Sequence, residues 1–209
     1  MTCSGKWRCS RAAMTRPHLV RGRRTCPAVA DPRQGRRGGL RLKDCVAGLI
    51  VRPVDGVKIR QATVRDIAGL TASSAALFAE DGAARDHLRD PAWPETHDAH
   101  WCANLIADPN ALILVATARE AVVGHLIATA ARASAMWIAA RAEIVSTFVC
   151  ASWRGKAVGS RLVTGFIEWA KDRGALRLTV STYDSNTDAV RFYRRHGFVP
   201  LSLDLALDL

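Results

Sequence analysis

The sequence predicts a domain of the α/β class, with one mixed sheet and helices on both of its faces. Apolar residues make up 49% of the 209 positions, which is enough for one hydrophobic core and does not require two large domains. Segments with the apolar period of a strand and of a helix follow one another from residue 57 onward. Towards the end of the chain the order is strand, loop, helix, strand, helix, strand.

A basic leader, residues 1–56, differs in composition from residues 57–209. It carries 13 Lys/Arg against 3 Asp/Glu, whereas the remainder carries 17 against 16. It lacks sustained apolar periodicity, as disordered segments do. We interpret it as an unstructured leader or as the product of a start codon assigned too far upstream. An organellar transit peptide and a nucleic-acid-binding arm are the alternatives. Because the positive charge lies in the leader, we do not expect the nearly neutral domain to bind nucleic acid.

The cysteines argue against a metal site and a disulfide framework. Four of the six lie in the leader at spacings that match no zinc pattern, and we expect no metal. The other two are too few and too far apart to suggest a disulfide framework. Because disulfides are rare in the reducing cytosol, this favours a cytoplasmic protein. No apolar run is long enough to predict a membrane span. In order, the cysteines are Cys3, Cys9, Cys26, Cys45, Cys102 and Cys150.

In the first part of the domain, the sequence predicts one strand, two helices and three further strands. Residues 57–60 alternate like a strand, and Thr63 is the expected N-cap of a helix with Asp66 in its first turn. A second helix is expected over residues 94–107. Strands are expected over residues 112–116, 122–130 and 143–149, the first two joined by a polar turn at Arg119 and Glu120.

In the second part of the domain, the sequence predicts two helices that alternate with strands. An apolar stripe that begins near Gly159 indicates a helix, which Gly174 closes as a C-cap. Residues 176–181 alternate as a strand, and residues 187–196 form the next helix. Gly197 ends that helix, and Phe198 begins the last β segment.

Residues 154–160, Arg-Gly-Lys-Ala-Val-Gly-Ser, lie between a strand and a helix and predict an anion site. Small residues let the backbone approach a ligand, and the free N–H groups at a helix N-terminus attract phosphate oxygens. The patterns of P-loop nucleotide hydrolysis and of dinucleotide binding are absent.

This loop resembles the Arg/Gln-x-x-Gly-x-Gly/Ala element of the GNAT superfamily of N-acetyltransferases, with Ala157 where the family usually has glycine. Downstream, the segment from Asn186 to Phe198 resembles the family's Asn-x-x-Ala-x-x-Phe-Tyr-x-x-x-Gly-Phe segment at every named position. The two motifs stand in the family's order, and the resemblance covers residues 57–209.

The resemblance implies a central mixed, mostly antiparallel sheet of six to seven strands, splayed between strands four and five and flanked by about four helices. It implies an N-acetyltransferase that uses acetyl-CoA as co-substrate. The backbone N–H groups of Thr147 and Val149 would hold the pantetheine arm and the thioester oxygen. Asn186 would bind the pantetheine or cap its helix. The remaining residues expected to bind acetyl-CoA are Arg154, Gly155, Lys156, Ala157, Val158, Gly159, Ser160 and Arg161.

The resemblance implies two catalytic side chains. Tyr193 would protonate the leaving thiolate as a general acid; the alternative is a core aromatic. Glu143 resembles the general base of the family's histone-modifying members, and its spacing from Thr147 predicts that both lie on one face of a strand. The alternatives are a solvated carboxylate, and a relay water held by Ser146 and Thr147.

The acceptor is predicted to be a primary amine, and the acidic residues between Glu80 and Asp98 favour a cationic one, such as a polyamine, an aminoglycoside-like antibiotic or a lysine-rich peptide. These residues could equally be a solvated face. Trp93 and Trp101 would line an acceptor pocket or anchor their helix. A catalytically weak acetyl-CoA-binding regulatory module is the alternative function, and whether the protein is a homodimer stays open.

Overall fold

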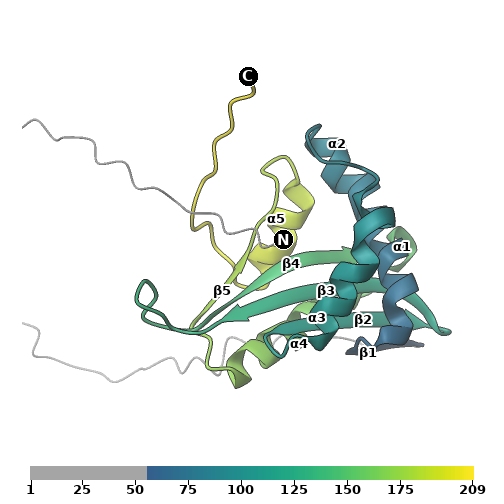
Figure 1. The fold of residues 1–209 in the computed structure, drawn as a ribbon, viewed down its shortest axis with the longest axis horizontal. Coiled ribbons are helices and arrows are strands. Elements are labelled where there is room, and N and C mark those ends of the chain that lie inside the picture. The colour runs from purple at the N-terminus through teal and green to yellow at the C-terminus, as the bar shows by residue number, and fades with distance from the viewer. Residues whose placement is uncertain (1–55) are drawn as a thin grey trace, which may run out of the picture. The chain divides into compact units, whose positions relative to one another are not determined.

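The computed structural model describes residues 56–209, and these form the domain in Figure 1. The predicted leader, apart from Gly56, lies outside the described residues. The first described strand begins at Val57, where the first strand was predicted to begin.

A five-stranded mixed sheet forms the centre of the domain (Figure 1). Its strands lie in the order of the sequence; the first three pairings are antiparallel, and only β4 and β5 are parallel. The mixed, mostly antiparallel sheet is as expected, although the family resemblance implied six to seven strands and the described residues form five. The strands are β1 (Val57–Gln61), β2 (Ala111–Ala118), β3 (Ala121–Ala131), β4 (Arg141–Val149) and β5 (Arg177–Val180).

Helices cover both faces of the sheet, which confirms the α/β class. On one face, α1 (Ile67–Leu77) and α3 (Ala99–Ala107) bury Leu70 and Cys102 against the sheet. On the other, α4 (Val158–Asp172) buries Phe166, and α5 (Thr187–Arg195) packs beside it. Short helical segments complete the chain: η1 (Val64–Asp66), η2 (Phe78–Gly82), α2 (Ala83–Arg85), η3 (Pro94–Asp98) and η4 (Ala151–Trp153).

The start of the first helical segment follows the predicted capping. Asp66 accepts from the Thr63 backbone N–H at 2.8 Å, and Thr63 and Asp66 form a capping box. Both oxygens of Asp66 also accept from Arg60 at 2.7 Å. The Arg60 guanidinium therefore holds the pKa of the Asp66 carboxyl well below its ordinary value. This pair fixes the connection between the first strand and the first helix.

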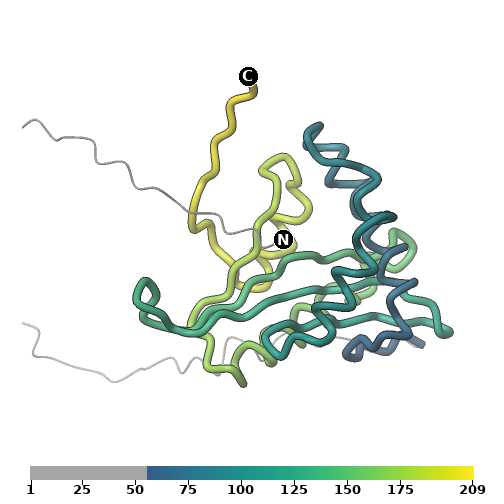
Figure 2. Tube along the Cα trace, in the orientation of Figure 1, coloured from purple at the N-terminus to yellow at the C-terminus, as the bar shows by residue number. Residues whose placement is uncertain are grey.

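The segment after α5 differs from its prediction. The sequence predicted a β segment from Phe198, but residues 198–209 form neither helix nor strand. In Figure 2 this segment leaves the sheet and runs away from it. Its leucines are therefore exposed rather than part of the core.

Candidate active site

The last residues of β4 present backbone donors that the sheet does not use. The Cys150 N–H donates to Val123 O at 3.0 Å, so Val149 and its partner Gly124 are a non-hydrogen-bonded pair of the antiparallel ladder. The N–H of Val149, and that of Thr147 two residues earlier, therefore point away from β3. On that side β4 pairs with β5 only as far as Ile144, so these two donors meet no strand among the described residues.

A bulge in β4 decides which side chains share a face. Ile127 lies opposite Ser146 and Ala128 lies opposite Ile144, so Val145 is the extra residue. Beyond the bulge the alternation is reversed. Side chains before and after Val145 that are an even number of residues apart therefore lie on opposite faces of the sheet.

The prediction that Glu143 and Thr147 lie on one face of the strand is wrong because of the bulge at Val145. Thr147 lies opposite Leu126, which packs on the α4 face, whereas Glu143 lies opposite Thr129 and shares the α1 face with Ser146. The expectation assumed unbroken alternation, and an inserted residue cannot be recognised from spacing alone. Glu143 is exposed.

The loop before α4 has the backbone shape expected of an anion site. Gly155 and Ala157 both have left-handed backbone, with φ of 70° and 57°. The turn leads directly into α4, whose first N–H groups, those of Val158, Gly159 and Ser160, have no partner within the helix. A Cβ added at Gly159 would lie 3.2 Å from the Phe192 ring, so this glycine lets α4 and α5 approach each other closely.

The two cationic side chains at the start of the loop have partners within the protein. Arg154 forms a bidentate ion pair with Glu80 of η2, with N–O distances of 2.6 and 2.7 Å, and its Nε donates to Val149 O at 2.8 Å. The pKa of Glu80 is lowered by this pair. Lys156 lies over the Trp153 ring at 4.9 Å. Arg154 thus links the end of β4 to the segment after α1.

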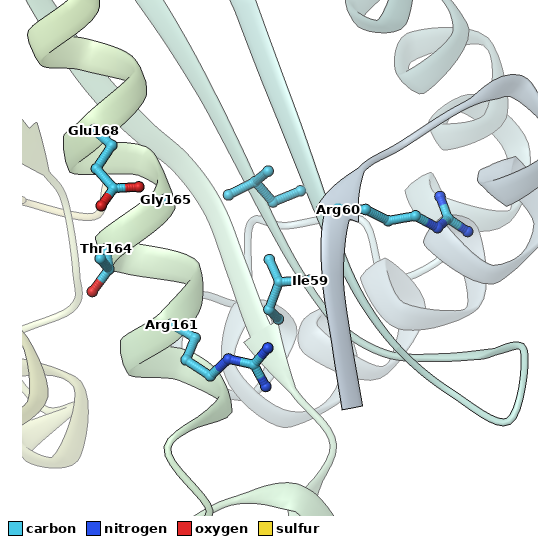
Figure 3. Close-up of a pocket in the computed structure, with 7 residues that line it drawn as sticks. Ile59, Arg60, Arg161, Thr164, Gly165 and Glu168 are labelled. Atoms are coloured by element: carbon cyan, nitrogen blue, oxygen red, sulfur yellow. The ribbon is translucent and has the colours of Figure 1, made fainter. Parts of the chain in front are cut away.

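Arg161 lies on a different side of α4 from the loop. Its guanidinium donates to Val57 O at 3.0 Å. Together with Ile59, Leu114 and Glu168 it lines a groove of about 520 Å³ between β1 and α4 (Figure 3). The expected contact of Arg161 with a phosphate stays a prediction, and the observed contact is with the sheet edge.

The Tyr193 phenol of α5 lies near the Thr147 side chain of β4. Burial raises the pKa of its phenol, the nearby Thr147 hydroxyl works against that rise, and the Asp81 carboxylate adds to it. The phenol is therefore protonated at neutral pH and can donate a proton. Its ring lies 5.1 Å from the Phe192 ring and 5.6 Å from the Phe198 ring, which supports the packing interpretation, and the role of general acid stays a prediction.

Asn186 caps α5, which was one of its two predicted roles. Its side-chain oxygen accepts from the Ala189 N–H at 3.1 Å, and its Nδ2 donates to Asp81 at 2.7 Å. Asp81 also accepts from Arg85 at 2.5 Å, and Arg85 donates to Ser185. The segment η2–α2 is thereby tied to the N-terminus of α5.

A buried hydrogen-bonded chain was missed by the sequence analysis. His125 of β3 is fully buried; its Nδ1 lies 2.8 Å from Ser73 Oγ on α1, and its Nε2 lies 2.8 Å from Ser146 Oγ on β4. Burial lowers the pKa of His125 to about 4, so the ring is neutral at neutral pH. The sequence gives no spacing that joins these three positions, because they belong to three different elements.

The acidic segment is less exposed than its sequence suggests. Asp98 is fully buried, and burial raises the pKa of its carboxyl. Trp93 stacks on Phe78 at 5.6 Å and meets Trp101 edge-on at 5.7 Å. Trp101 packs against the α1 and α3 core, so the tryptophans anchor their helix.

Residues 56–209 contain neither a cluster of metal-ligating side chains nor a membrane-spanning helix. Among these residues no three His, Cys, Asp or Glu side chains are grouped so that they could hold a metal ion. In the same part of the chain, no helix has the length and apolarity needed to cross a bilayer.

Known proteins share both sequence and architecture with this chain. Streptothricin acetyltransferase A of Bacillus subtilis (strain 168) is 37% identical over 59 residues, which are 28% of this chain and only 34% of that protein. The crystal structure of a transcriptional regulator from Bacillus halodurans C-125 is 28% identical, with a TM-score of 0.59, and the match covers 73% of this chain and 99% of that one.

An aminoglycoside N-acetyltransferase, AAC(6')-Iy in complex with CoA, has a TM-score of 0.60 at 15% identity, over 73% of this chain and 94% of that one, and so shares the fold. The model of the acetyltransferase (GNAT) family matches residues 80–198, which is more than half of the sequence. With this match and the predicted motifs in place, the chain belongs to the GNAT family of acetyltransferases.

Proposed function

We propose that the protein is an N-acetyltransferase that moves an acetyl group from acetyl-CoA to a primary amine by direct attack through a tetrahedral intermediate. One observation carries the proposal. The N–H groups of Thr147 and Val149 point to the side of β4 where its pairing with β5 has ended, and the Tyr193 phenol lies near the Thr147 side chain. A thioester carbonyl fits donors arranged in this way.

The binding of acetyl-CoA is supported by the loop and by the end of β4. The free N–H groups at the start of α4 suit the pyrophosphate, and Gly155 allows the backbone to approach it. Lys156 would add a positive charge there. Pairing between β4 and β5 ends at Ile144, and we propose that the pantetheine arm binds beyond this point, the role implied for the family's splayed strands.

In the proposed reaction the amine nitrogen bonds to the thioester carbon and the carbon–sulfur bond breaks. The N–H groups of Thr147 and Val149 stabilise the oxyanion, and Tyr193 gives its proton to the departing thiolate. The amine proton leaves on the α1 face, through Glu143 or through a water held by Ser146. Proton removal and proton donation would therefore occur on opposite faces of β4.

The proposed acceptor is a cationic amine. The chain resembles a streptothricin acetyltransferase over 59 residues and shares its fold with aminoglycoside acetyltransferases. Asp81 supports this class, because its carboxylate lies near Tyr193 and so near the proposed site of transfer. Arg85 and Arg154 neutralise part of the acidic charge of this segment.

The proposal is tested with the full chain. Acetyl-CoA binding is measured by calorimetry, and thiol release is followed with streptothricin, aminoglycosides, polyamines and lysine peptides. We expect binding, and release with at least one amine whose acetylation mass spectrometry detects. Absence of binding would end the proposal. Binding without release across the panel would favour a regulatory acetyl-CoA-binding module.

A matched pair of variants tests the role of Tyr193. Tyr193→Phe is expected to lower kcat by about 10²–10⁴-fold, the usual contribution of a general acid, with little change in the affinity for acetyl-CoA. Tyr183→Phe is the control, since these are the only two tyrosines in the chain. Equal kcat values for the two variants would assign Tyr193 to packing alone.

A further inference from the structure

The buried hydrogen-bonded chain runs from α1 through β3 to β4 and ends at the proposed site. Ser73 Oγ lies 2.8 Å from His125 Nδ1, and His125 Nε2 lies 2.8 Å from Ser146 Oγ. Ser73 and His125 are buried, whereas Ser146 is half-buried. Ser146 also lies on the α1 face of β4, where the amine proton is proposed to leave. The chain therefore reaches from the core to the proposed acceptor side.

Only one direction of these hydrogen bonds satisfies both buried groups. A neutral imidazole has one N–H donor and one acceptor nitrogen. Among residues 56–209, His125 Nδ1 is the hydrogen-bond partner of the buried Ser73 hydroxyl, so the Ser73 proton needs Nδ1 as its acceptor. Nε2 then carries the ring hydrogen and donates it to Ser146 Oγ. The opposite direction would leave the Ser73 proton buried without an acceptor.

This direction leaves the outer side of the Ser146 hydroxyl free. One lone pair of Oγ accepts from His125, so the second lone pair and the hydroxyl proton are available to groups on the α1 face. Burial lowers the pKa of His125 to about 4, so the ring stays neutral and does not take up the proton of an amine. A proton that reaches Ser146 Oγ is therefore balanced by the release of the Ser146 proton outward.

The bulge in β4 brings Glu143 onto the same face as Ser146. The two residues are three positions apart and would lie on opposite faces of a regular strand, but the extra residue Val145 places both on the α1 face. Three residues of a strand span about 10 Å, a gap that water molecules can bridge. The Glu143 carboxylate is exposed, so it can pass a proton on to solvent.

We propose that Ser146 is the first acceptor of the amine proton and that Glu143 receives this proton through water. Ser73 and His125 are positioning residues that aim the Ser146 hydroxyl away from the core. The inference rests on the acetyl transfer proposed above.

The atoms and electrons of this step balance. An N–H bond of the bound ammonium group breaks, its proton goes to Ser146 Oγ, and the nitrogen keeps the electron pair that then attacks the thioester carbon. The original Ser146 proton goes to water and from there to the Glu143 carboxylate. Ser146 is a neutral hydroxyl before and after the step, and His125 keeps its Nε2–H throughout.

The first test determines the His125 tautomer without any turnover. Nitrogen-15 NMR of the full chain distinguishes an imidazole with Nε2–H from one with Nδ1–H, and the signals lost in His125→Asn assign this ring among the six histidines. We expect Nε2–H in the wild type at neutral pH. An Nδ1–H ring would overturn the inference, because the Ser146 proton would then point into the core.

The second test is a double-mutant cycle on kcat with an amine that the wild type acetylates. Ser146→Ala is expected to lower kcat about 10²-fold, at the low end for acid–base catalysis, and Ser73→Ala about tenfold. Because Ser73 acts only through Ser146, Ser73→Ala should have no further effect in the Ser146→Ala background. The control is Ser74→Ala, which removes the neighbouring buried hydroxyl and should leave kcat unchanged.

The outcomes separate a positioning role from a structural one. KM for acetyl-CoA is expected to stay constant in every variant, and circular dichroism checks that each is folded. Additive losses in the double variant, or equal losses for Ser73→Ala and Ser74→Ala, would overturn the inference. An Nδ1–H ring in a wild type that acetylates an amine overturns this inference alone, whereas a wild type that acetylates no amine overturns the proposed function as well.

Discussion

The buried Ser73–His125–Ser146 chain makes the free energy of unfolding depend on pH between the folded and unfolded pKa values of His125. The imidazole has a pKa of about 4 in the folded protein, against about 6.5 in an unfolded chain. Since unfolding then takes up a proton, the stabilising contribution is complete above pH 6.5 and is lost as the pH falls to 4. The full difference corresponds to about 3 kcal/mol, of which about 2 kcal/mol falls between pH 7 and pH 5.

The comparison requires a variant that lacks the imidazole without leaving buried hydroxyls unpaired. Ser73→Ala, His125→Leu and Ser146→Ala together remove the chain and both of its ends, which keeps the cost small. His125→Leu alone leaves two hydroxyls without their partner, at about 1–3 kcal/mol each. Urea denaturation at pH 7 and pH 5 gives the free energy of unfolding of each protein.

The wild type should lose about 2 kcal/mol more than the triple variant between pH 7 and pH 5. Asp66 and Glu80, with lowered pKa values, lose their contributions at more acid pH, and Asp98, with its raised pKa, works in the opposite direction in both proteins. Equal losses in the two proteins would refute the buried neutral imidazole.

Three further substitutions test the backbone and the capping. Gly124→Ala places a Cβ 2.8 Å from Phe148 O, so we expect about 1–3 kcal/mol lower stability in urea and weaker acetyl-CoA binding by calorimetry. The left-handed backbone of Ala157 costs about 1–2 kcal/mol, and Ala157→Gly removes this strain. Because glycine loses about 0.5–1 kcal/mol more conformational entropy on folding, the net gain in stability should be about 0.5–1 kcal/mol and should appear as a higher Tm. Asp66→Asn removes a carboxylate with a lowered pKa, so the variant should lose less stability than the wild type when urea denaturation is repeated below pH 4.

The sequence predicted those parts of the fold and site that depend on local chemistry. Thr63 and Asp66 predicted the first cap, and the small residues of 154–160 predicted the turn into α4. The φ values of 47° at Arg119 and 69° at Glu120 bear out the predicted tight turn between β2 and β3.

The parts that the sequence did not predict depend on contacts between distant elements. The bulge at Val145 reverses the faces of β4, and only the pairing with β3 reveals it. The Ser73–His125–Ser146 chain joins three elements, and Asp98 is buried because α3 packs on α1. The alternation after Phe198 predicted a strand, but a strand also requires a partner, which the sequence of a single chain does not specify.

The Arg154–Glu80 pair has a consequence for how acceptor preference can evolve. The family's loop pattern accepts Gln as well as Arg at position 154, and a neutral amide there would leave the Glu80 carboxylate without its cation. One substitution at the start of the proposed phosphate-binding loop would then add a negative charge to the segment that is proposed to face the amine. Relatives could thus diverge in acceptor charge through position 154 alone, while the segment that contains Glu80 stays unchanged.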